Sequence, residues 1–60
     1  MTRKERILIK AKMLELNITQ SDIARQYGCT RQAINNVLTG KENNLLLEEW
    51  LLKWLHQNTA

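Results

Sequence analysis

The sequence contains no proline and only two glycines, and these scarcities favour helices over other regular structures. Proline and glycine are the residues that most disfavour a helix interior. The chain instead uses Ala, Leu, Lys, Gln, Glu and Arg freely, and all of these favour helix. Sixty residues make one small domain, which buries only about 60% of the surface of its unfolded chain. We therefore expect a single compact all-α domain over residues 1–60.

Cysteine and histidine each occur once, and this excludes two common ways of stabilising a small domain. Cys29 has no second cysteine in the chain with which to form a disulfide. With His56 as its only histidine, the chain cannot assemble the ligands of a structural zinc site. We expect no metal and no cofactor. Helix packing and self-association remain as sources of stability.

Other absences exclude whole classes of protein. No apolar run approaches the roughly 18 residues of a membrane span, and no signal-peptide core follows the charged first residues. There is no glycine-rich phosphate loop and no nucleophile–base pair, and nothing positions Asp22 beside His56. No segment suggests a sensor domain, so no small-molecule effector is expected. We expect a cytoplasmic protein that is not an enzyme.

The charge is positive and unevenly distributed. The net charge is +3, with seven basic and three acidic residues before residue 32, against two and three after it. A basic half of a domain suggests a polyanionic partner, most simply nucleic acid. A solvated basic face explains the same charge, so charge alone does not decide between them.

Apolar spacing and capping residues predict four helices. The first begins after Thr2, which forms a capping box with Glu5, and it runs to about Leu16. Its apolar stripe is too wide to assign one inward face, and Asn17 ends it. Two short helices follow, over residues 20–27 and 31–39. Each begins after a threonine cap and ends at a glycine, namely Thr19 and Gly28, then Thr30 and Gly40.

The last predicted helix begins after Asn43 or Asn44 and carries more large apolar residues than one face can hold. The broad inward face is formed by Leu47, Trp50, Leu51, Trp54 and Leu55. Leu45, Leu46 and Leu52 lie beside this face, and surplus apolar surface indicates a partner. We expect these three leucines to form the interface of a homodimer. The alternative is a monomer in which they cover the first helix.

The two short helices and the three residues between them predict a helix-turn-helix. Ala24 is small enough for a close helix crossing, and Gly28 permits a sharp turn. The shared apolar seam is expected to contain Ile23, Tyr27, Cys29, Ile34 and Val37. Residues 18–41 read ITQSDIARQYGCTRQAINNVLTGK. This segment resembles the helix-turn-helix of the Cro and lambda-repressor type, the XRE-like family. Members usually have five helices, so the resemblance implies a lambda-repressor-like domain of four helices here, with five as the alternative.

The helix over residues 31–39 has no acidic residue, and its polar side chains suit the DNA major groove. Arg31 can donate two hydrogen bonds to guanine, and Gln32 and Asn36 can read adenine. Ala33 suits a thymine methyl group, although packing explains it equally well. For the DNA phosphates the expected contacts are Thr19, Gln20, Thr30, Asn35 and Lys41, with that of Gln20 implied by the resemblance. Capping alone would also explain Gln20 and Thr30.

These features predict a sequence-specific regulator of transcription that binds double-stranded DNA, as a small phage or bacterial repressor does. A homodimer would read an inverted repeat, because one short helix contacts few base pairs. The alternative is a protein-interaction module, like an antitoxin or anti-repressor, which works through the Leu/Trp-rich last helix. DNA selection distinguishes the two.

Overall fold

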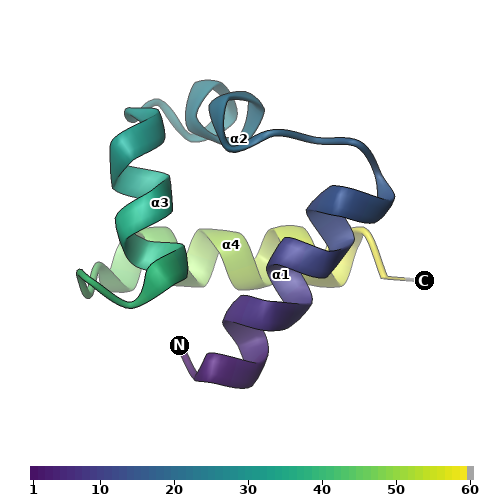
Figure 1. Cartoon of the computed structure of the whole chain (residues 1–60), viewed down its shortest axis with the longest axis horizontal. Helices are drawn as coiled ribbons and strands as arrows, with labels where there is room; N and C mark the ends of the chain where they lie inside the picture. Colours follow the sequence, from purple (N-terminus) through teal and green to yellow (C-terminus); the bar gives the residue numbers. More distant parts are fainter. Residues whose placement is uncertain (60) are drawn as a thin grey trace.

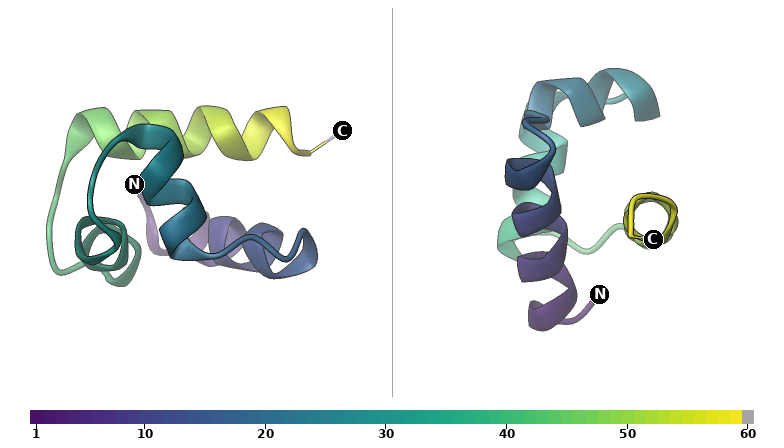
Figure 2. Two further views of the ribbon diagram at one scale, coloured as in Figure 1. Left: turned by 90° about the horizontal axis from the view of Figure 1, so that it is seen from above. Right: turned by 90° about the vertical axis from the view of Figure 1, so that its right-hand side faces the viewer.

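The computed structural model describes residues 1–59, which form four helices and no strands. These are α1 (Arg3–Glu15), α2 (Gln20–Tyr27), α3 (Arg31–Thr39) and α4 (Leu45–Gln57). Helix α4 lies along the longest axis of the molecule, with α1 and α3 in front of it and α2 crossing above it in the view of Figure 1 (Figures 1 and 2). The predicted all-α fold with four helices is confirmed. Within residues 1–59, no helix has both the length and the apolar character needed to cross a bilayer.

The helices begin where the capping residues predict. Thr2 and Thr19 form full capping boxes, and the oxygens of Thr30 and Asn44 accept hydrogen bonds from N–H groups three residues ahead, at 3.1 and 3.2 Å. The caps of α1 and α2 each add a carboxylate at the positive end of the helix dipole. Four local signals in the sequence thus fix the starts of all four helices.

Left-handed residues end three of the helices. Gly28 and Gly40 have φ values of 94° and 82°, and Asn17, just beyond α1, has a φ of 58°. Helix α1 ends at Glu15, one residue before the predicted end at Leu16. The remaining helix, α4, ends at Gln57 with Asn58 as its C-cap.

One apolar core joins all four helices. The wide stripe of α1 is resolved in favour of Ile9 and Met13, which are four residues apart and both buried. The other members of the core are Ile23, Ala24, Ile34, Val37, Leu38, Leu47, Leu51 and Trp54. Tyr27 and Trp50 extend it with an edge-to-face contact between ring centroids 5.6 Å apart. The predicted seam of the two short helices is therefore largely buried, with Tyr27 and Cys29 half-buried at its edge.

Among residues 1–59, the exposed large apolar side chains belong to α1, its C-cap and the start of α4. They are Ile7, Leu8, Leu14, Leu16, Leu45 and Leu46. Leu45 and Leu46 are 76% and 72% exposed, whereas Leu52 is half-buried and packs against the core. Of the three leucines predicted to form an interface, two are therefore freely accessible and the third is only partly so.

A buried carboxylate connects the first residue to α4. Glu48 is 6% exposed, and its carboxylate accepts hydrogen bonds from the Met1 ammonium at 2.6 Å and from the Asn44 N–H at 3.1 Å. This ion pair holds the entry to α1 against α4.

Candidate nucleic-acid interface

The turn between α2 and α3 sets the position of the candidate interface. The N–H groups of Gly28 and Cys29 both donate to the carbonyl oxygen of Ala24, at 2.8 and 3.0 Å. This closes α2 and directs the chain into α3, which packs against α2 with Ala24 buried between them. Burial raises the pKa of the half-buried Cys29 thiol, so it remains a neutral packing group and a poor nucleophile.

The first turns of α2 and α3 enclose a polar depression of about 490 Å³. Its lining comprises Gln20, Thr30, Arg31, Gln32 and Asn35. All five are predicted DNA-contact residues, so the structure brings together side chains expected to contact bases and others expected to contact phosphates. The N-terminus of α2 opens on this depression, where free N–H groups and the helix dipole favour an anion.

Arg31 and Thr30 have donors available at the rim of the depression. Within residues 1–59, the Arg31 guanidinium makes no hydrogen bond or ion pair, and the side chain is exposed. The Thr30 hydroxyl oxygen accepts the Ala33 N–H at 3.1 Å, which leaves its own proton free to donate. Ala33 itself is half-buried. Capping and phosphate binding are thus compatible at Thr30.

Thr19 is occupied by its own helix cap. Its N–H and its hydroxyl both donate to the Asp22 carboxylate at 2.9 Å, and the hydroxyl accepts the Asp22 N–H at 3.1 Å. The Thr19 N–H, the Thr19 hydroxyl and nearby Arg25 together lower the pKa of Asp22. A phosphate contact from Thr19 would therefore require Asp22 to release one of these donors.

Further along α3, an acidic residue lies beside the predicted base-contact residues. Gln32 Nε2 donates to Asn36 Oδ1 at 3.3 Å, and Asn36 Nδ2 donates to Glu42 Oε1 at 3.1 Å. The N–H groups of Lys41 and Glu42 also donate to the Asn36 carbonyl oxygen. Glu42 is not among the residues predicted from the sequence, although the left-handed Gly40 turns the chain back towards the last turn of α3.

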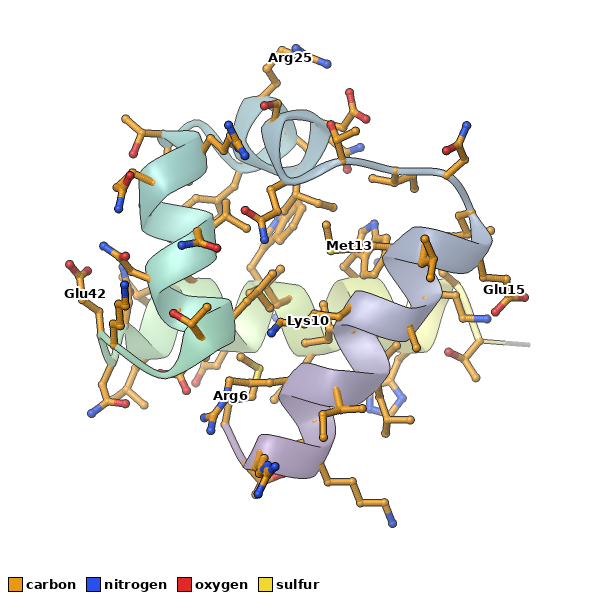
Figure 3. The ribbon with its side chains drawn as sticks, in the orientation of Figure 1. Arg6, Lys10, Met13, Glu15, Arg25 and Glu42 are labelled. Atoms are coloured by element: carbon orange, nitrogen blue, oxygen red, sulfur yellow. The ribbon has the colours of Figure 1, made fainter. Side chains whose placement is uncertain are left out.

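Basic residues of α1 extend the polar surface past the C-terminal end of α3. Arg6 and Lys10 point from α1 towards that end (Figure 3). With Arg3 they line a second depression of about 320 Å³ that also includes Thr39. The Arg6 guanidinium lies close to Gly40, which is followed by the exposed Lys41. Positive charge therefore lies at the C-terminal end of α3, and Arg31 places one further positive charge in its first turn.

The exposed start of α4 lies at the same end of the molecule as α3 (Figures 1 and 2). Leu45 and Leu46 are its first two residues. A partner bound there would be close to the candidate interface.

Among residues 1–59, no three His, Cys, Asp or Glu side chains are arranged to hold a metal ion.

Comparison with known proteins supplies the family. No curated protein and no solved structure matches the chain. A sequence profile described as helix-turn-helix matches residues 9–51, which include α2, the turn, α3 and the start of α4. The match covers more than half of the chain and agrees with the geometry of the turn. The chain belongs to the helix-turn-helix family of the Cro and lambda-repressor type, a family of DNA-binding regulators that are not typically enzymes.

Proposed function

We propose that this protein is a sequence-specific regulator of transcription that places α3 in the major groove of double-stranded DNA. The observation that carries the proposal is the polar depression, in which the unpaired Arg31 of α3 lies beside the N-terminus of α2. A helix in the major groove reads base edges, while a neighbouring helix start binds a phosphate. We propose that the protein is a repressor of the phage or bacterial kind, because a protein bound over a promoter blocks transcription by occupancy alone.

The proposed contacts divide by chemistry. Arg31 reads guanine, Gln32 and Asn36 read or help to read adenine, and Ala33 lies near a thymine methyl group. The proposed phosphate contacts are Thr19, Gln20, Thr30, Asn35 and Lys41. Among these, Gln20 and Thr30 are best supported, because they line the depression beside a helix start and a free hydroxyl proton.

We further propose a homodimer that binds an inverted repeat through Leu45, Leu46 and, in part, Leu52. Apolar surface removed from water stabilises an association by about 25 cal/mol per Å². The start of α4 lies at the same end of the molecule as α3 (Figure 1), so a dimer that pairs there would hold both copies of α3 near its interface. We propose that these two helices read half-sites about 34 Å apart. Leu46→Glu should therefore abolish association while leaving the helical content unchanged.

Analytical ultracentrifugation of wild type and Leu46→Glu, with and without DNA, tests the dimer. Leu14→Glu is the matched control, because Leu14 is 84% exposed on a different helix. A wild type that is monomeric at micromolar concentration and binds one non-palindromic site would contradict the dimer. So would a Leu46→Glu protein that dimerises as the wild type does.

A protein-interaction module is the second candidate, and one observation favours it. Helix α1 and the end of α4 form an apolar groove of about 420 Å³ whose lining includes Leu8, Ala11 and Leu55. This groove lies on a different surface from the DNA contacts, so a protein could bind there alone or in addition.

Selection of duplexes from a random pool tests the DNA-binding proposal against this alternative. A regulator enriches one sequence, and its affinity falls steeply as salt increases because bound counterions are released from the DNA. Failure to enrich any duplex at low salt would contradict DNA reading and favour the interaction module.

A further inference from the structure

Glu42 is an acidic residue that lies against the outer side of α3, where DNA is proposed to bind. Its carboxylate accepts the Asn36 side-chain N–H at 3.1 Å, and its backbone N–H donates to the Asn36 carbonyl oxygen at 3.2 Å. Two contacts thus hold Glu42 to a single residue of the helix. Figure 3 shows Glu42 beside α3, at the opposite end of the molecule from Glu15.

The carboxylate fixes the direction of a chain of hydrogen bonds. An ionised carboxylate can only accept, so the Asn36 atom that faces Glu42 must be the amide nitrogen. The Asn36 oxygen then faces Gln32, and the Gln32 atom that meets it at 3.3 Å must be its nitrogen. Glu42 therefore determines which way round both amides lie, although it contacts only one of them.

The orientation of Gln32 has a consequence for base reading. With one N–H committed to Asn36, Gln32 presents its oxygen as an acceptor and its remaining N–H as a donor. Adenine presents the complementary pair in the major groove, a donor at N6 and an acceptor at N7, whereas guanine presents two acceptors. A Gln32 amide held the other way round would present two N–H donors and would suit guanine.

We propose that Glu42 is a specificity-determining residue that makes Gln32 read adenine by positioning Asn36. This inference rests on the proposed function. The negative charge also weakens binding to all DNA, because it lies near the phosphates. An unfavourable charge of this kind lowers the affinity for unselected DNA sequences. The fixed amides preserve the affinity for the preferred sequence. Charge and amide orientation have different signatures, so one set of variants separates them.

The test uses wild type, Glu42→Lys, Glu42→Gln and the control Glu15→Lys, each checked for helical content by circular dichroism. The base pair read by Gln32 is first identified as the one at which Gln32→Ala loses preference. Affinities are then measured for duplexes carrying adenine or guanine at that position. A lysine donates to Asn36 and reverses both amides, so Glu42→Lys should lower the adenine-to-guanine preference by roughly tenfold. Glu42→Gln permits either direction and should bring the preference towards unity.

Glu15→Lys makes the same change of charge far from α3 and should leave the preference unchanged. If Glu42→Lys strengthens binding to both duplexes equally, Glu42 acts only through its charge and the inference is overturned. An unchanged preference with lower thermal stability would make Glu42 a cap of the loop and would overturn it equally. A Gln32→Ala protein that keeps every preference also overturns it. These failures differ from that of the proposed function, in which wild type itself selects no sequence.

Discussion

The helix-turn-helix pair, α2 and α3, and the outer pair, α1 and α4, use their apolar residues differently. In the first pair Ile23, Ile34, Val37 and Leu38 are all buried, and no large apolar side chain is exposed. The outer pair contributes to the same core and still leaves large apolar side chains exposed on both helices. The first pair therefore exposes no large apolar side chain, with Tyr27 and Cys29 half-buried at its edge, and this suits a surface proposed to bind DNA. The outer pair leaves apolar surface exposed, and the proposed homodimer uses part of it.

Truncating a side chain in the shared core should have the largest effect on stability. Ile34 is 0% exposed, so Ile34→Ala leaves a cavity in the core and should lower the free energy of unfolding by about 2–5 kcal/mol. In a domain this small, that is a large part of the total stability. Leu14→Ala is the control from the outer pair, because Leu14 is 84% exposed and should cost little. Urea unfolding followed by circular dichroism measures both, and equal losses would contradict this difference between the pairs.

The turn between α2 and α3 should be the next most sensitive point. Gly28 has a φ of 94°, and an added Cβ would meet nothing within 4 Å, so a side chain there is strained but not obstructed. Gly28→Val should lower stability by about 1–3 kcal/mol through backbone strain alone. Thermal melts would show a lower midpoint with unchanged helical content. An unchanged midpoint would mean that the turn tolerates a β-branched residue and does not depend on glycine.

The smallest effect is expected from the capping carboxylates. The pKa of Asp22 in the folded protein lies below its ordinary value of 3.8, chiefly because the Thr19 N–H donates to the carboxylate. Its contribution to stability is therefore complete above pH 3.8 and is lost as pH falls through the lowered pKa. Asp22→Asn should make stability less dependent on pH in this acidic range. Glu5 in α1 has a pKa lowered in the same way by Thr2, so a smaller dependence should persist.

Asp22→Asn tests the cap of α2, in the helix-turn-helix pair, and Glu5→Gln tests the cap of α1, in the outer pair. Melting midpoints between pH 2 and pH 6 would measure the two losses separately. If neither variant changes the pH dependence, the capping boxes do not form in solution.

Local signals in the sequence were enough to predict much of the fold. Threonine caps, two glycines and a left-handed asparagine placed the first three helices to within a residue, because each signal acts on its own turn of the chain. The inward face of α1 was not predictable. Its apolar stripe is wider than the area that α4 and α3 cover, so the choice of Ile9 and Met13 depends on how the helices pack.

The candidate site was predictable in part for the same reason. Arg31, Gln32 and Asn35 follow from the spacing of one helix, and Gln20 and Thr30 from helix starts that the turn brings together. The contact of Glu42 with Asn36, and the burial of Glu48 beneath Met1, depend on the paths of the connecting segments in three dimensions. Hydrophobic periodicity in the sequence does not predict the paths of these connecting segments.

Reading of DNA by the first turn of α3 is the central claim, and Arg31→Ala tests it most directly. The measurement is the affinity of wild type and Arg31→Ala for the duplex selected from a random pool and for a scrambled duplex, at several salt concentrations. Loss of a bidentate guanine contact should cost about 1–3 kcal/mol on the selected duplex and much less on the scrambled one. An equal loss on both duplexes would make Arg31 a phosphate contact and would contradict the claim that this residue reads a base.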